Sequence, residues 1–179
     1  TVNSGTYSTE CITAEEANNQ GLSHGPWCAG VLNSGGTLII KGGTFSNDNF
    51  GENSLATAAR GLLLADTGAN IQIEDGTFNA VKAIIDIQNN LGDASKQPNA
   101  LLKGGDYSAN PTKATLSYGD DYIHVAEGYV VNLNANGTYT VIPTTLKDGA
   151  VLDLGGVEYN GTITVEGNVT IKGDTKIKT

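Results

Sequence analysis

The chain is poor in several residue types, and each shortage narrows what the protein can be. Its 179 residues include no methionine, and aromatic residues make up only 6% of the chain. Glycine, by contrast, occurs 24 times. That composition argues against a helical bundle, because glycine destabilises helices. Long apolar runs are missing as well, so the sequence predicts no membrane span.

Basic residues are scarce too. Ten Lys and Arg stand against 19 Asp and Glu, which gives a net charge of -9 and a pI of about 4.5. Phosphate backbones and anionic lipid repel such a chain, so we expect no nucleic-acid partner and no membrane insertion. Charged residues are only 16% of the chain, while the hydrophobic 39% arrives in short β-branched runs. These runs argue against full disorder.

Only two cysteines occur, Cys11 and Cys28, on either side of an irregular segment that contains His24 and Trp27. In an extracellular protein, a disulfide between them would stabilise the fold by roughly 3 kcal/mol in the chain-entropy model. The alternative is two small buried apolar residues. A zinc site is disfavoured, because His24 is the one nearby nitrogen ligand and no CxxC spacing occurs.

The two ends of the sequence are typical of interrupted repeats. No basic segment followed by an apolar stretch opens the chain, so a signal peptide is not predicted. Residues 1–7 are typical of the end of a repeat, and strand-like alternation continues through residues 169–177 without a terminating turn. We therefore expect the natural protein to extend beyond both ends.

A block of glycine, a polar residue (usually threonine) and an aromatic residue recurs about every 30 to 40 residues, which is the spacing of a solenoid or an array. Its copies are Gly5-Thr6-Tyr7, Gly43-Thr44-Phe45, Gly76-Thr77-Phe78 and Gly105-Asp106-Tyr107. Apolar residues two apart, such as Ile71 and Ile73, precede the blocks and predict strands with one buried face. Repeats of this kind that stack on one another form the coils of a parallel β-helix, and we expect the block aromatics to stack inside it. An antiparallel sandwich also has short strands, but it gives no reason for one block to recur at one corner.

The pattern changes in the C-terminal third. Asn136-Gly137 between alternating runs predicts an antiparallel hairpin over residues 129–142. We expect three regions: coils with inserted loops over 1–128, a hairpin or cap over 129–143, and further short coils or an assembly strand over 144–179. Loops are expected at residues 46–54 and 89–98, and one helical turn at 56–60.

The blocks at residues 40–46, 73–78, 127–131 and 136–141 resemble right-handed parallel β-helix repeats. Such repeats are known from large secreted or surface-displayed proteins of bacteria, notably gut anaerobes, and from phage fibre and tailspike shafts. The resemblance implies an all-β, right-handed parallel β-helix (solenoid). It leaves the function open, because the scaffold carries pectate-lyase-like enzymes, adhesins and inert stalks.

The sequence offers little catalytic chemistry. A lyase resembling those on this fold would need clustered carboxylates and a basic side chain, but Arg60 is the single arginine. The adjacent acidic pairs do not converge as a hydrolase requires, since neighbours on a strand point to opposite faces. These pairs are Glu15-Glu16, Glu74-Asp75 and Asp120-Asp121. Asp86, between Ile85 and Ile87, is expected to face outward.

Other site chemistry is equally weak. His24 and His124 are isolated, no nucleophile lies in a recognisable elbow, and no phosphate-binding glycine loop occurs. Structural calcium at Asp120, Asp121 and Glu127 is open, although the repeat of calcium-loaded β-rolls is absent. We predict no catalytic residue, no metal site and no cofactor.

Candidate contact residues lie in loops and at the C-terminal end. Trp27, Tyr118 and Tyr122 could stack on sugar rings, with plain loop packing as the alternative. Sequons place possible glycosylation at Asn136, Asn160 and Asn168. A last group, Val169, Ile171 and Ile177, forms a candidate assembly strand.

Three functions follow from these features. The first is a non-catalytic extracellular module for structural display or adhesion at a cell or virion surface, facing glycan. The second is a subunit of a self-assembling filament or phage fibre that pairs strands end to end. The third and least favoured is a polysaccharide-active enzyme.

Overall fold

The computed structural model describes residues 1–10, 30–48, 61–80, 82–89, 92–115, 117–154, 156–174 and 176–178. Here the chain forms strands and two short 3₁₀ helices, η2 (Ala94–Lys96) and η3 (Ser117–Tyr122), which confirms the expected all-β class. No helix in these ranges is long and apolar enough to cross a membrane. The predictions for Cys11, Glu15, Glu16, His24, Trp27, Cys28, Arg60 and the turn at 56–60 lie outside the described residues.

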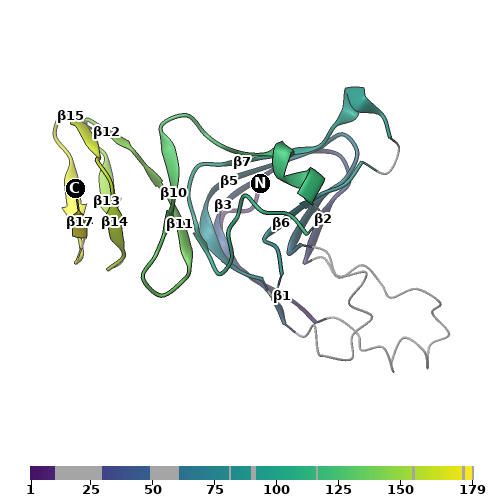
Figure 1. Cartoon of the computed structure of the whole chain (residues 1–179), viewed down its shortest axis with the longest axis horizontal. Helices are drawn as coiled ribbons and strands as arrows, with labels where there is room; N and C mark the ends of the chain where they lie inside the picture. Colours follow the sequence, from purple (N-terminus) through teal and green to yellow (C-terminus); the bar gives the residue numbers. More distant parts are fainter. Residues whose placement is uncertain are drawn as a thin grey trace.

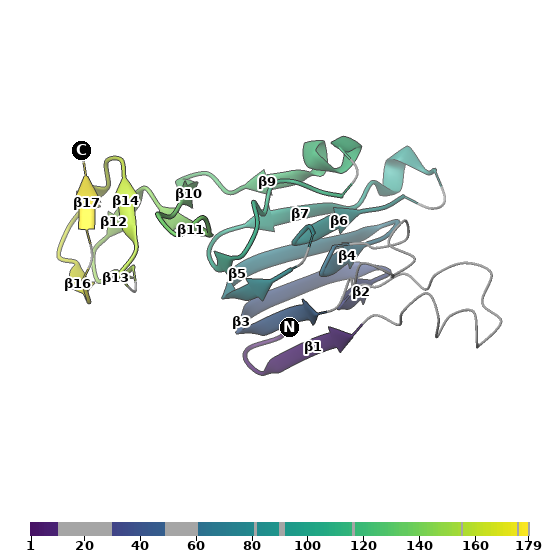
Figure 2. The same ribbon diagram turned by 60° about the horizontal axis from the view of Figure 1, so that its bottom comes forward.

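The largest sheet has eight strands and joins segments far apart in the sequence. Its order is β1-β3-β5-β8-β11-β10, with β7 pairing β5 and β9. The bounds are β1 Thr6–Glu10, β3 Gly36–Asp48, β5 Ala69–Asn79, β7 Asn99–Leu102, β8 Asp106–Tyr107, β9 Ile123–Val125, β10 Tyr129–Leu133 and β11 Tyr139–Pro143. Strands β1, β3, β5, β7, β8 and β9 pair in parallel, and Figure 2 shows β1, β3, β5, β7 and β9 in successive layers.

One loop prediction fails within this sheet. Ser46 was expected to open a loop, yet β3 continues to Asp48. The backbone explains the difference, because Ser46 is paired with Ser8 of β1 on one side and with Asn79 of β5 on the other. Two flanking strands hold the segment extended in spite of its polar side chains.

The loop expected at 89–98 contains η2, whose N-cap Asp93 accepts a hydrogen bond from the Ser95 amide.

A second sheet contributes side chains to the main core. It is parallel, in the order β2 (Val31–Asn33), β4 (Leu63–Ala65) and β6 (Ile85–Ile87). Leu63 and Ile85 from this sheet share one hydrophobic cluster with Ile40, Ile71 and Ile73 from the large sheet. Both β4 and β6 are buried at every position, so neither has a solvent face.

The recurring block forms an aromatic column (Tyr7, Phe45, Phe78 and Tyr107). Parallel pairing aligns its four members, and successive ring centroids lie 4.9, 5.1 and 5.1 Å apart in stacked orientation. The glycine two residues earlier is needed for its backbone: Gly76 has φ +133°, and a Cβ there would lie 3.1 Å from the Gly43 carbonyl oxygen. The expectation that the block aromatics stack inside is confirmed for Phe45, Phe78 and Tyr107, all of which are buried.

The hairpin is confirmed. β10 and β11 pair antiparallel from Tyr129 and Pro143 to Leu133 and Tyr139. The connecting turn closes where the Gly137 amide donates to the Asn134 carbonyl, and Gly137 takes φ +85°. This left-handed residue is what glycine at that position predicts.

Beyond the hairpin, the chain forms two rounds of three short strands. The first round is β12 (Thr145–Lys147), β13 (Val151–Asp153) and β14 (Glu158–Asn160); the second is β15 (Thr164–Glu166), β16 (Thr170–Lys172) and β17 (Lys176–Lys178). Each strand pairs in parallel with its counterpart in the other round. Leu146, Leu152 and Tyr159 form a separate small core with Ile142 and Leu154. This C-terminal unit lies beyond the hairpin, on the side away from the parallel strands of the large sheet (Figure 1).

Candidate functional site

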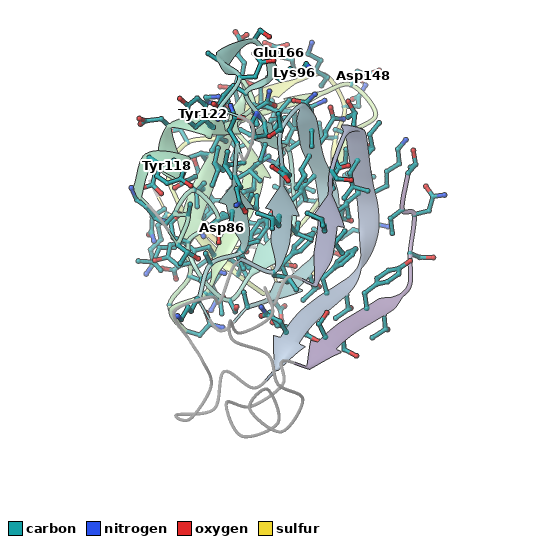
Figure 3. All side chains as sticks on the ribbon, turned by 90° about the vertical axis from the view of Figure 1, so that its right-hand side faces the viewer. Asp86, Lys96, Tyr118, Tyr122, Asp148 and Glu166 are labelled. Carbon is teal, nitrogen blue, oxygen red and sulfur yellow. The ribbon has the colours of Figure 1, made fainter. Side chains whose placement is uncertain are left out.

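A short helical turn, η3, carries Tyr118 and Tyr122, the two predicted contact aromatics that lie in the described part of the chain. Tyr118 is 51% exposed and lies at the outer edge of the molecule in Figure 3. Tyr122, four residues later, is partly buried and packs against the main core. The turn therefore has one aromatic anchor and one aromatic that reaches solvent. Trp27, the third predicted contact, lies outside the described residues.

Asp86 holds the segment before this turn in place, and the expectation that it faces outward was wrong. It is 3% exposed. One carboxylate oxygen, Oδ2, accepts a 2.6 Å hydrogen bond from the Gly61 amide, and Oδ1 accepts one of the same length from the Thr115 amide. Thr115 belongs to the segment before η3, and this segment lies over the outer face of β6. Although side chains alternate along β6, Asp86 is therefore not exposed to solvent. Figure 3 shows Asp86 well inside the outline of the molecule.

A second carboxylate fixes the turn from within. Asp120 Oδ1 accepts from the Ala114 amide and Oδ2 accepts from Lys113 Nζ, both at 2.8 Å. The hydrogen bond from Lys113 is the main reason that the pKa of Asp120 lies below its ordinary value, and the bond to Asp120 raises the pKa of Lys113. Gly119 is buried, and a Cβ there would lie 2.8 Å from the Ala114 Cβ. Tyr118 is thus carried on a turn that is tied down on both sides.

A cleft of about 710 Å³ lies between the large sheet, the hairpin and the C-terminal unit. Its wall carries a connected set of polar side chains: Thr140 Oγ1 donates to Asp106 Oδ1 at 2.9 Å, and Asn134 Nδ2 donates to Thr138 and Thr140 at 2.8 and 3.0 Å. Glu74, Asp75 and Asp153 also line it, together with Lys103. Hydroxyl, amide and carboxylate groups in this arrangement suit a polyhydroxylated ligand.

Sequence reasoning missed this cleft as a site. Tyr107 was assigned to packing, and it is buried with its hydroxyl donating to the Gly104 carbonyl; burial raises the pKa of this phenol. Asp106 stands next to it and faces the cleft. A signal was present, because Asp106 replaces the threonine of the recurring block.

The remaining candidates fall on the surface without forming a cluster. Within the described ranges, no three His, Cys, Asp or Glu side chains lie close enough to hold a metal ion. His124, Asp121 and Glu127 are exposed. Glu74 lies 3.7 Å from Lys41 and accepts a hydrogen bond from Gln72, while Asp75 accepts from the Gly76 amide. The sequon residues Asn136, Asn160 and Asn168 are all exposed.

The predicted assembly residues lie on the second round of the C-terminal unit. Val169 is partly buried against the small core. Ile171 and Ile177 are 52% and 38% exposed.

Comparison of the chain with protein-family models, curated proteins and solved structures gives no match.

Proposed function

We propose that the chain is a non-catalytic module of a right-handed parallel β-helix that displays a glycan-binding surface outside a cell or on a virion. The observation that best supports this proposal is the half-exposed aromatic side chain of Tyr118. It lies on a turn held in place by hydrogen bonds from backbone amides to two carboxylates. A held aromatic loses little conformational entropy when a flat sugar face stacks on it.

The β-helix interpretation is supported by the pairing of strands. Parallel partners recur in the order in which the chain supplies them, from β2 to β4 to β6 and from β1 to β3 to β5. The aromatic column runs across four such partners at nearly constant spacing. A stack of this kind is a stiff scaffold on which loops such as the one containing η3 serve as the variable surface.

The experiment is retention of the purified chain on columns of immobilised polysaccharide, using starch, xylan, mannan and an acidic pectin. We expect retention on a neutral polymer, since the net charge of -9 disfavours the acidic one. Tyr118→Ala should abolish retention and Tyr118→Phe should keep it, because the ring supplies the contact. Leu133→Ala is the matched control, because Leu133 is similarly exposed, at 57%, but lies on the hairpin.

The same columns separate the turn from the cleft. If Tyr118→Ala binds as the unchanged chain does and Asp106→Ala does not, the glycan site is the cleft and the proposal for the turn is refuted. If no column retains the unchanged chain, the glycan-facing function is refuted and a display role without a sugar ligand is left.

A fibre subunit is the second candidate function. The exposed apolar residues of β15, β16 and β17 favour it, since uncovered strand edges readily add strands. Head-to-tail stacking of this kind predicts polymers that lengthen with protein concentration.

A further inference from the structure

The hairpin holds the walls of the cleft in fixed positions. Neighbouring residues of β11 pack to opposite sides, because Val141 belongs to the main core and Ile142 to the small core of the C-terminal unit. Asn132, which is 6% exposed, adds a hydrogen bond of 3.2 Å from its Nδ2 to the Glu158 carbonyl of β14. Figures 1 and 2 both show the hairpin between β5 and the C-terminal unit. Since the two cores share one hairpin, the cleft is formed before any ligand arrives, as most small-molecule sites are.

One wall of the cleft carries three polar residues on neighbouring strands, which we call the polar file (Thr77, Asp106 and Thr140). Thr77 of β5 is paired with Asp106 of β8, and Asp106 is paired with Thr140 of β11. Thr140 donates to Asp106 Oδ1 at 2.9 Å. The other carboxylate oxygen, Oδ2, and the Thr77 hydroxyl have no hydrogen-bond partner among the described residues. The polar file therefore offers an unused acceptor and an unused hydroxyl to a ligand.

Negative charge prevails along the cleft. Its described lining residues include four carboxylates, those of Glu74, Asp75, Asp106 and Asp153, against the ammonium group of Lys103. In the part of the chain that the structure describes, no three acidic side chains come close enough to hold a metal ion. A ligand of this cleft therefore meets the carboxylates with separate groups of its own. The excess of negative charge favours a cationic ligand over an anionic one.

Asp106 also distinguishes its copy of the recurring block from the other three. The equivalent residues are Thr6, Thr44 and Thr77, and parallel pairing places all four in one register. Threonine is favoured in strands, whereas aspartate is disfavoured there. The exchange thus works against strand formation, and a cationic group bound at the cleft accounts for it.

We propose that the cleft binds an amino sugar, which is a polyhydroxylated ring with a protonated primary amine. The ammonium group donates to Asp106 Oδ2, and ring hydroxyls exchange hydrogen bonds with Thr77 and Lys103. The apolar face of the ring packs on Val151 of β13, which lines the opposite wall and is 56% exposed. A volume of about 710 Å³ has room for a short oligosaccharide. This inference does not rest on glycan binding at η3, because the two surfaces share no residue.

The test is titration calorimetry of the full 179-residue chain with three disaccharides of the same linkage. These are the disaccharide of glucosamine, its N-acetylated form and cellobiose, which differ in having an amine, an acetamide or a hydroxyl group at one position of each ring. At about pH 6 the amine is protonated and the carboxylates are ionised. We expect the glucosamine disaccharide to bind about tenfold more tightly than either of the others, because it gains a charge-assisted hydrogen bond. If either of the others binds as tightly, or if none of the three binds, the proposal is overturned.

Substitution of Asp106 tests the carboxylate. Asp106→Thr restores the residue of the other blocks, and Asp106→Asn keeps an acceptor for Thr140. Both variants should reduce the affinity for the glucosamine disaccharide to that for cellobiose. Glu127→Gln is the matched control, because it removes one negative charge from an exposed residue outside the cleft; it should leave the affinity unchanged. Equal losses in Asp106→Asn and Glu127→Gln would mean that the net charge of the chain attracts the amine, which overturns the proposal.

A substitution on the opposite wall locates the sugar. Val151→Trp fills the cleft from the C-terminal unit and should abolish binding of the glucosamine disaccharide. If Tyr118→Ala abolishes it and Val151→Trp does not, the sugar lies at η3 and the proposal is overturned. The columns of starch, xylan and mannan carry no amine. Their result therefore decides the function of η3, and the titrations decide that of the cleft.

Discussion

Removing Phe78, one of the two inner rings of the aromatic column, is the sharpest test of how this fold is stabilised. Phe78 is fully buried and stacks on Phe45 and on Tyr107, with ring centroids 5.1 Å away on each side. Truncating a buried phenylalanine to alanine costs about 3 to 5 kcal/mol. We expect Phe78→Ala near the upper end, because two stacked pairs worth about 0.5 to 1.5 kcal/mol each are lost together.

Tyr7→Ala is the matched control at the end of the same column. Tyr7 is 41% exposed and has one stacking neighbour, Phe45, at 4.9 Å. Less buried area and one lost pair limit the expected cost to about 1 to 2 kcal/mol. The two variants delete similar rings from equivalent register positions, so the difference between them measures burial and two-sided stacking.

Urea unfolding followed by far-ultraviolet circular dichroism compares the two variants. A difference of about 3 kcal/mol at a slope of about 2 kcal/mol per molar urea separates their midpoints by about 1.5 M. Equal midpoints for Phe78→Ala and Tyr7→Ala would refute the claim that the column is a central stabilising element. If Phe78→Ala does not fold at all, Phe78→Leu should fall between it and the unchanged chain.

Two further predictions concern the carboxylates behind η3. Asp86→Ala leaves the Gly61 and Thr115 amides without their acceptor and should cost about 2 to 4 kcal/mol in urea unfolding, with faster hydrogen exchange at Thr115; unchanged exchange would contradict the tether. The lowered pKa of Asp120 means that its contribution to stability is complete above its ordinary pKa near 4 and is lost as the pH falls through the lower folded value. Asp120→Asn should therefore flatten the decline in unfolding midpoint from pH 4 to pH 2, and an unchanged decline would show that the ion pair with Lys113 contributes nothing.

Local patterns in the sequence determined the elements of the fold. The recurring glycine predicted a turn between two strands, but Gly43 and Gly76 lie inside β3 and β5, where a positive φ and a close backbone approach leave no room for a side chain. Alternating apolar residues predicted the strands, and Asn136-Gly137 predicted the hairpin that β10 and β11 form. These signals are readable because each depends on backbone geometry or period within a few residues.

Only the tertiary structure decided which faces are covered. Asp86 alternates with isoleucines as an outward residue would, yet the segment that reaches Thr115 lies over it. Ile171 carries the same inward signal as Leu152, yet one is 52% exposed and the other 4%. The cleft beside Asp106 likewise needs the hairpin and the C-terminal unit, which come later in the chain. Alternation of apolar and polar residues shows that the side chains of a strand point to two faces. Which of these faces is buried depends on contacts between residues distant in sequence.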